Sequence, residues 1–339
     1  MNQCPVPDLN SATFVGKDAH PSEHTALAIN RFEEEKGKLR FENTKAGITA
    51  FLSWLPTVYA KKDTVIVGIE GGSSTRHRLI SEILETYQHV YEVNPLYTKQ
   101  RRTYGTRGVK SDPVDAKLIA EVLTRKLTEL PKISKNELSS KMLCLKKTVW
   151  FYEEITVQGA RNKNQLHQLK RELDLSSSAQ EKQVLAVIIK GKTAELKQIK
   201  NQQKKLTIQL DRLLEAYGKN LTSFPGIGIV SAAKIVAHTN AIERFKTVNK
   251  FLSYAGIAPK ERSSGKSKRH IQSTKGNRRL NFALQWVAVN QLTRNEKAKA
   301  YFDKKVNEGK SKKHALRCVM KRTASIIYGM LKSGEKYKG

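Results

Sequence analysis

Acidic residues are scarce in this chain. Its 339 residues contain 31 Asp and Glu against 62 Lys and Arg, which gives a formal net charge of +31 and a pI near 10.0. A protein this basic is expected to bind a polyanion, with nucleic acid as the first candidate and a membrane surface as the weaker one.

Cysteines and long apolar runs are scarce as well. Cys4, Cys144 and Cys318 are odd in number and far apart, so neither a disulfide framework nor a zinc site fits them, and a reducing cytosol is the simplest environment. No apolar run approaches the eighteen or so residues of a spanning helix. The N-terminus lacks the charged and then apolar pattern of a signal peptide. We therefore expect a cytoplasmic protein without a membrane partner.

The patterning along the chain predicts four segments. With 39% hydrophobic residues the chain can bury two cores, with an extension between them. Residues 1–11 lack any apolar period and predict a flexible tail. Residues 12–133 alternate strand-like and helix-like stretches, residues 134–217 keep helical spacing with a coiled-coil-like seam, and residues 218–339 form a further, mostly helical unit.

The order of elements in residues 12–133 predicts an α/β domain with a ribonuclease-H-like fold. Three strands come first, then helix, strand, helix and strand. The expected elements are Phe14–Asp18, Thr25–Asn30, Lys38–Glu42, Lys45–Ala60, Val65–Glu70, Thr75–Tyr87 and His89–Val93.

Four acids stand out against the basic background. Asp18 and Glu70 each end an expected strand, and Asp112 and Asp115 lie three residues apart where a helix is expected to begin, with Asp112 as its N-cap and Pro113 at the first helical position. A single Asp at such a place is more often a turn or cap residue. Together the four predict an oxygen-rich pocket of the kind that Mg²⁺ prefers, or Mn²⁺ in its place, suited to phosphodiester chemistry.

Three further stretches are candidates for nucleic-acid contact. The basic, glycine-punctuated segment Lys99–Lys110 predicts a mobile loop over phosphate. The turn Pro225-Gly-Ile-Gly228 resembles a helix-hairpin-helix turn whose N–H groups can hold a phosphate, although a tight turn without a ligand has the same pattern. The third stretch is a glycine-bearing loop with Ser263 and Ser264, which are either flexible phosphate contacts or a nucleophile among cations. The candidate contacts are Arg101, Arg102, Arg107, Lys110, Gly226, Gly228, Arg262, Lys266, Lys268, Arg269, Lys275, Asn277, Arg278 and Arg279.

The aromatic residues Trp150, Phe151 and Trp286 lie at helical spacing among apolar residues. Core packing is the expected role of these side chains, in preference to stacking on bases.

These motifs, in this order, resemble one family over nearly the whole chain. The acids, the Pro-Gly turn, Gly256-Ile-Ala-Pro259, Ser263-Ser-Gly265 and Lys275-Gly-Asn-Arg-Arg-Leu280 are similar to those of DEDD transposases of the insertion-sequence "one-ten" family, which includes Piv-like DNA invertases. Lys17 departs from the pattern, since the family usually has an apolar residue before the first Asp.

The resemblance implies a RuvC-like domain, a coiled-coil arm and a C-terminal transposase domain. It implies Mg²⁺ bound by the four acids, a serine nucleophile and a bacterial, nucleoid-associated location. The motif places that serine before glycine, which selects Ser264, with Ser263 as the alternative. The implied partners are donor DNA, target DNA, a structured non-coding bridge RNA and three further copies in a tetramer, in which the serine loop of one protomer completes the acidic site of another.

Two other functions fit the same residues less well. A RuvC-like nuclease or resolvase would hydrolyse DNA with metal-activated water and would not need the serine. A nucleic-acid-binding protein without catalytic activity would not need carboxylates at all four positions.

Overall fold

The computed structural model describes residues 8–20, 22–59, 64–70, 76–105, 111–258, 260–264, 267–271 and 276–338. The chain divides into two compact units, one ending at Leu138 and the other beginning at Ser139. None of the helices formed by the described residues combines the length and apolar character needed to cross a membrane.

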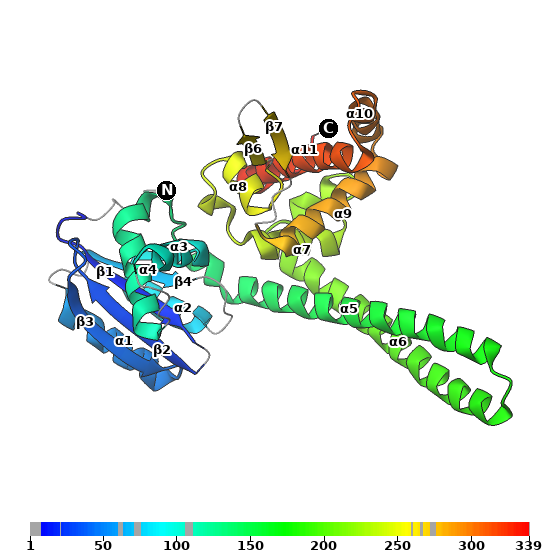
Figure 1. The fold of residues 1–339 in the computed structure, drawn as a ribbon, viewed down its shortest axis with the longest axis horizontal. Helices are drawn as coiled ribbons and strands as arrows, with labels where there is room; N and C mark the ends of the chain where they lie inside the picture. The colour runs from blue at the N-terminus through cyan, green and yellow to red at the C-terminus, as the bar shows by residue number, and fades with distance from the viewer. Residues whose placement is uncertain are drawn as a thin grey trace. The chain divides into compact units, whose positions relative to one another are not determined.

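The first unit is built on a five-stranded mixed sheet with the strand order β3-β2-β1-β4-β5 (Figure 1). β1 pairs antiparallel with β2 and parallel with β4, and β4 pairs parallel with β5. This is the ribonuclease-H-like arrangement that the sequence predicts. Its elements are β1 (Thr13–Ala19), β2 (Glu23–Ile29), β3 (Glu35–Glu42), α1 (Lys45–Val58), β4 (Val65–Glu70), α2 (Arg76–Thr86), β5 (His89–Val93), α3 (Pro95–Gly105), α4 (Asp112–Lys126), η2 (Leu127–Glu129) and η3 (Lys135–Leu138).

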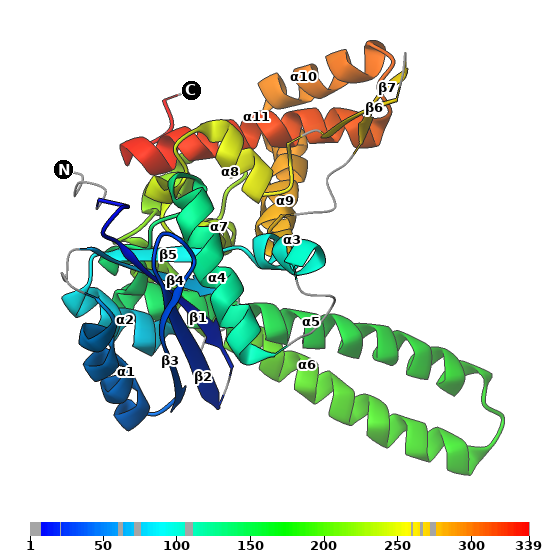
Figure 2. The ribbon, with the colours of Figure 1, turned by 60° about the vertical axis from the view of Figure 1, so that its left-hand side comes forward.

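The central strands are buried on both faces, and alternation along them separates two cores. Val15, Val67 and Ile69 pack with α1 and α2, whereas Phe14 and Ile66 pack with α4. Figure 2 shows α4 running along one face of the sheet and α1 with α2 on the other. The sequence signal for such strands is the nearly continuous apolar run that β4 has.

A pair of glycines lets α4 lie directly on the sheet. Gly16 of β1 and Gly68 of β4 are partners in the parallel register. A Cβ on Gly16 would lie 2.0 Å from the Ala116 carbonyl oxygen, and one on Gly68 would lie 2.9 Å from a methyl group of Leu123. The close approach of α4 therefore depends on the absence of side chains at these two positions.

Replacing Gly16 with alanine should destabilise the protein by about 1–3 kcal/mol or more, because an added methyl group meets backbone atoms of α4 that have no room to move. Denaturant unfolding measures the loss. Gly191→Ala, in the interior of α6 where a Cβ meets nothing within 4 Å, is the matched control and should be neutral or stabilising by up to about 1 kcal/mol. Equal stabilities of the Gly16 variant and the wild type would show that α4 does not need this contact.

The imidazole of His24 makes the first unit sensitive to acid. This β2 side chain is 1% exposed, and its pKa is lowered from 6.5 to about 4, first by burial and then by the positive charge of Lys17. The unfolded chain takes up this proton near pH 6.5 and the folded chain only near pH 4. The neutral imidazole's contribution to the free energy of unfolding is therefore fully present above pH 6.5 and is lost as the pH falls toward 4. At about 1.4 kcal/mol per pH unit, the loss is about 3 kcal/mol.

Denaturant unfolding at about pH 7 and about pH 4.5 should show this loss in the wild type and a smaller loss in His24→Leu, which has no imidazole to protonate. An identical pH dependence of the two proteins would contradict the assignment.

The second unit consists of an antiparallel helical arm and a helical domain. The arm is α5 (Ser140–Leu175) and α6 (Ala179–Leu214), which lie side by side in Figure 1 and bury Leu166, Leu185 and Ile199. The domain core includes Leu221, Ile235, Phe251, Leu284 and Ile327. Its elements are η4 (Lys219–Ser223), α7 (Ile229–Thr239), η5 (Ile242–Arg244), α8 (Val248–Tyr254), β6 (Lys260–Ser264), β7 (Ser267–Ile271), α9 (Arg278–Arg294), α10 (Glu296–Asn307) and α11 (Lys312–Ser333).

Candidate active site

Parallel pairing brings Asp18 and Glu70 to the same edge of the sheet. Lys17 of β1 is paired with Ile69 of β4, so Asp18 and Glu70 are the next residues along the two strands. Both acids alternate with the glycine pair and therefore share the face covered by α4. Lys17 alternates with Val15 on the opposite face and is fully buried there. The departure from the family pattern thus lies on the other side of the sheet from the acids.

The carboxyl of Glu70 lies in an electrostatically crowded position. Burial raises its pKa, the hydroxyl of Thr98 opposes this by donating a hydrogen bond of 2.8 Å, and the charges of Asp18 and Asp115 raise the pKa further. These effects place Asp18 and Asp115 within electrostatic reach of Glu70. A buried group of like charges gains from a nearby cation.

The amino end of α4 supplies the other two acids. Ser111 is the N-cap, with an extended backbone at φ −149° and ψ 151° and no capping bond from its side chain. The prediction that Asp112 is the N-cap was therefore wrong, because Asp112 lies one residue inside the helix. Asp112 is exposed, whereas Asp115 is buried. Negative charge in the first helical turn is favourable, because the helix dipole has its positive end there.

Helix α3 covers part of the stretch that the sequence predicts as a loop. The prediction was wrong for residues 99–105, while residues 106–110 lie outside the described residues. The missed signal was Asn94-Pro95, in which Asn94 accepts a hydrogen bond of 2.9 Å from the Leu96 N–H and Pro95 begins the helix. From α3, Thr98 reaches Glu70, and the guanidinium of Arg102 forms an ion pair with Oδ1 of Asp115.

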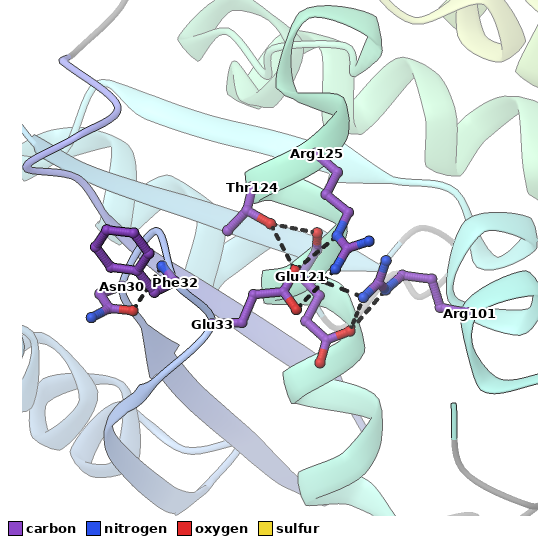
Figure 3. Close-up of polar contacts among 7 residues, drawn as sticks. All are labelled: Asn30, Phe32, Glu33, Arg101, Glu121, Thr124 and Arg125. Atoms are coloured by element: carbon purple, nitrogen blue, oxygen red, sulfur yellow. Dashed lines mark hydrogen bonds and ion pairs between the residues drawn. The ribbon is translucent and has the colours of Figure 1, made fainter. Parts of the chain in front are cut away.

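A second group of ion pairs fixes α3 and α4 to the β2–β3 turn (Figure 3). Arg101 of α3 donates to Oε2 of Glu121, at 2.8 Å from its Nε. Arg125 binds both carboxylate oxygens of Glu33, at 2.8 and 3.1 Å, which holds the pKa of Glu33 below its usual value. Glu33 itself has a positive φ of 65°. In this structure Arg101 and Arg102, predicted as nucleic-acid contacts, both bind acids of α4.

The donor chemistry of these acids suits a hard divalent cation, because carboxylate oxygens predominate and their mutual repulsion favours positive charge. In the described part of the chain, however, no three His, Cys, Asp or Glu side chains are arranged to hold a metal ion. Arg102 supplies the positive charge beside Asp115 instead. A metal ion bound by Asp115 would therefore replace this guanidinium.

In the second unit, the predicted Pro-Gly turn lies between η4 and α7. Gly226 has a positive φ of 85°, which glycine adopts without strain. Gly228 is the N-cap of α7 and has no side chain with which to bond the first N–H groups of the helix. These N–H groups are available in the way that a phosphate contact requires.

The serine segment is an antiparallel hairpin and not the loop that the sequence predicts. In β6 and β7, Arg262 pairs with Arg269, Ser263 with Lys268, and Ser264 with Ser267. Ser264 therefore ends β6 next to the hairpin's connection. The side chains of this hairpin lie outside the described residues, as do Arg107, Lys110, Lys266 and Lys275.

Three predicted nucleic-acid contacts follow the hairpin at the start of α9, and their contacts in the structure differ. Asn277 caps α9 through a 3.0 Å bond from the Leu280 N–H to its Oδ1. Arg279 forms an ion pair of 3.2 Å with Glu153 of α5, whereas Arg278 is exposed.

The expected core packing of Trp150, Phe151 and Trp286 was wrong, because these side chains are 52%, 42% and 51% exposed.

The fold and this site define a class of protein: a ribonuclease-H-like domain with acids at its central strand ends, followed by a helical arm and a helical domain. Residues 15–173 match a family model described as "Transposase", and residues 218–303 match the "Transposase IS116/IS110/IS902 family". The chain belongs to this family of transposases. The DEDD domain implies a general dependence on divalent metal.

Curated relatives agree with this assignment. An uncharacterized 43.6 kDa protein of insertion element IS110 from Streptomyces coelicolor is 29% identical over 157 residues, covering 45% of this chain and 39% of the relative. The aligned stretch thus spans well under half of that protein. The "Pilin gene-inverting protein" of Moraxella bovis is 25% identical over 346 residues, covering 96% of this chain and 98% of the relative.

Proposed function

We propose that this chain is an RNA-guided DNA recombinase that depends on Mg²⁺ and uses Ser264 as its nucleophile, with Ser263 as the alternative. The observation that carries the proposal is that the charges of Asp18 and Asp115 both act on Glu70 at one edge of the sheet, in a chain of net charge +31. Such a pocket serves phosphodiester chemistry, and such a charge serves binding to nucleic acid.

In the proposed reaction, the Ser264 hydroxyl attacks a DNA phosphorus. A serine Oγ–P bond forms, a P–O bond of the strand breaks, and the released deoxyribose hydroxyl takes up a proton. A hydroxyl from another strand then attacks the phosphoserine, which restores the serine and joins the strands. Each step exchanges one phosphodiester for another, so the bond energy is conserved without ATP.

Four acids would hold the metal in this proposal: Asp18, Glu70, Asp112 and Asp115. A bound Mg²⁺ would stabilise the negative charge that develops on the phosphoryl oxygens. Arg102 would leave Asp115 as the metal binds and would then be free to contact a phosphate of the same strand.

Assembly and RNA guidance are parts of the same proposal. The tetramer whose protomers complete one another's sites rests on the family resemblance alone. Guidance by a structured RNA rests on the family resemblance and on the positive charge, of which 22 Lys and Arg against 5 acids fall in residues 260–339. A discrete RNA that copurifies with the protein and is required for strand exchange would support it, and full exchange by RNA-free protein would refute it.

Site-specific inversion is the second candidate function. The pilin gene-inverting relatives align over 96% of the chain, so the whole architecture is similar to theirs. Inversion requires two recombining sites in opposite orientation on one DNA molecule, whereas insertion joins sites on two molecules. An assay with both substrate arrangements distinguishes them.

Exposed Arg278, at the start of α9, is expected to bind a DNA phosphate. Arg278→Gln should lower the magnitude of the slope of log K against log salt by about 0.9, the contribution of one phosphate. Arg294→Gln, exposed in the last turn of the same helix, is the matched control and should leave the slope unchanged. Equal slopes for all three proteins would remove this residue from the DNA contact.

A further inference from the structure

The C-terminal domain contains a small open cavity at the junction of α9, α10 and α11. Its volume is about 50 Å³. Benzene occupies engineered cavities of roughly 150 Å³, so this cavity is too small for a nucleobase and has room for a few water molecules or one oxyanion. The lining residues that matter to its chemistry are Gln291, Asn295, Lys297, Tyr301, Arg322 and Thr323.

The wall of the cavity includes a buried amide with an unused donor. Gln291 is 1% exposed, and its Oε1 accepts a hydrogen bond of 2.9 Å from Asn295. Its Nε2 has no acceptor among the described residues. Buried donors are almost always paired in folded proteins, so an unpaired one is a place where a water molecule or a ligand oxygen can bind.

The rim of the cavity is cationic. Lys297 of α10 and Arg322 of α11 are exposed, and neither forms an ion pair with a described carboxylate. The Arg322 guanidinium lies 5.3 Å from the ring centroid of Tyr301, which supports it from one side. No described acid lines the cavity, although Glu296 and Asp303 belong to the same helix α10. The rest of the lining is largely apolar and includes Phe224, Ala298, Val319 and Ile326. The charged groups at the cavity are thus both cationic, which favours an anion over a cation.

The cavity also adjoins the Pro-Gly turn. Phe224, just before the turn, lines the cavity. A Cβ added to Gly226 would lie 3.2 Å from Nε2 of Gln291, so this amide lies against the turn. Beyond the turn, α7 begins at Gly228 without a side-chain cap. The unused amide donor therefore lies close to a second candidate contact for a phosphate backbone.

We propose that this cavity binds one phosphodiester group of a nucleic-acid strand, held by Lys297 and Arg322 at the rim and by Gln291 at the wall. The identity of the strand as DNA or RNA rests on the proposed function, whereas the anion site does not. The cavity would fix the position of the backbone beside the Pro-Gly turn without reading sequence.

Binding of duplex DNA and of duplex RNA over a range of salt concentrations tests the proposal. The variant Lys297→Gln/Arg322→Gln should lose about tenfold in affinity and about 0.9 in slope for the strand that occupies the cavity. Lys299→Gln/Lys321→Gln removes the same charge from the same two helices, at exposed residues that do not line the cavity, and should retain wild-type binding. A selective loss with DNA or with RNA identifies the strand. Equal losses in both double variants would overturn the proposal.

Gln291→Met tests the wall independently of charge. Inorganic phosphate should raise the melting temperature of the wild type above its value in chloride at equal ionic strength. It should not do so for Gln291→Met or for the rim double variant. Gln291→Met removes the hydrogen bond from Asn295 together with the unpaired donor, so the melting temperature of each protein in chloride is its own baseline for the phosphate shift. The same phosphate shift in all three proteins would overturn the site. Ser264→Ala should lose strand exchange and keep the phosphate shift. The proposed nucleophile and the proposed anion site are therefore tested by independent measurements.

Discussion

Replacing Asp115 with asparagine should reduce strand exchange by about 10²–10³-fold or more while leaving the affinity for DNA within about twofold. The carboxylate of Asp115 is buried and, like that of Asp18, adds to the negative potential on Glu70. Asparagine keeps the shape of the side chain and removes the charge that a metal ion requires. Affinity comes from dispersed Lys and Arg side chains and should not change.

Glu121→Gln is the matched control for this prediction. Glu121 lies on the same helix and also pairs with an arginine of α3, but its partner is Arg101 and it has no part in the electrostatics of Glu70. Loss of the ion pair with Arg101 should weaken the packing of α3 on α4 and leave most of the strand-exchange activity. Asp112→Asn should behave like Asp115→Asn. Strand exchange by Asp115→Asn at a rate near that of wild type would show that the acidic pocket is misassigned.

Replacing Ser264 with alanine should abolish strand exchange, by about 10³-fold or more, because no other group would form the covalent intermediate. Ser264 ends β6 beside the hairpin's connection, where it pairs with Ser267 of β7. Ser263 is the neighbouring serine of the same strand, and Ser263→Ala is the natural control. Retained activity in Ser263→Ala with loss in Ser264→Ala is the expected pair of results, and the reverse pair would move the nucleophile by one residue.

The strands of the first unit are predictable because their signals are local. Val65–Glu70 is a continuous apolar run ended by an acid, and both the strand and its bounds are confirmed. The meeting of Asp18 with Glu70 follows from the parallel pairing of adjacent strands in the predicted fold. The glycine pair could also have been found in the sequence, because Gly16 and Gly68 each lie two residues before one of these acids.

The contacts of α3 could not be predicted in the same way. Composition suggested a phosphate-binding loop, whereas Arg102 binds Asp115, thirteen positions further along the chain, and Arg101 binds Glu121. A basic residue has the same sequence signal whether it meets a phosphate or a carboxylate. The exposure of Trp286 was missed for a related reason, because helical spacing among apolar residues does not reveal which face a partner covers. Leu280, Leu284 and Val287 form the buried face of α9 instead.

The central claim is covalent catalysis by Ser264 together with the acidic pocket, and trapping the DNA adduct tests it most directly. A nicked suicide substrate lets the attack occur and removes the strand that would reverse it. Protease digestion and mass spectrometry then locate the modified residue. We expect an adduct on Ser264 that requires Mg²⁺ and is lost in Asp18→Asn and Glu70→Gln. Strand exchange by wild type with no adduct, together with normal exchange by Ser264→Ala and Ser263→Ala, would contradict it and favour attack by a hydroxyl that the metal activates.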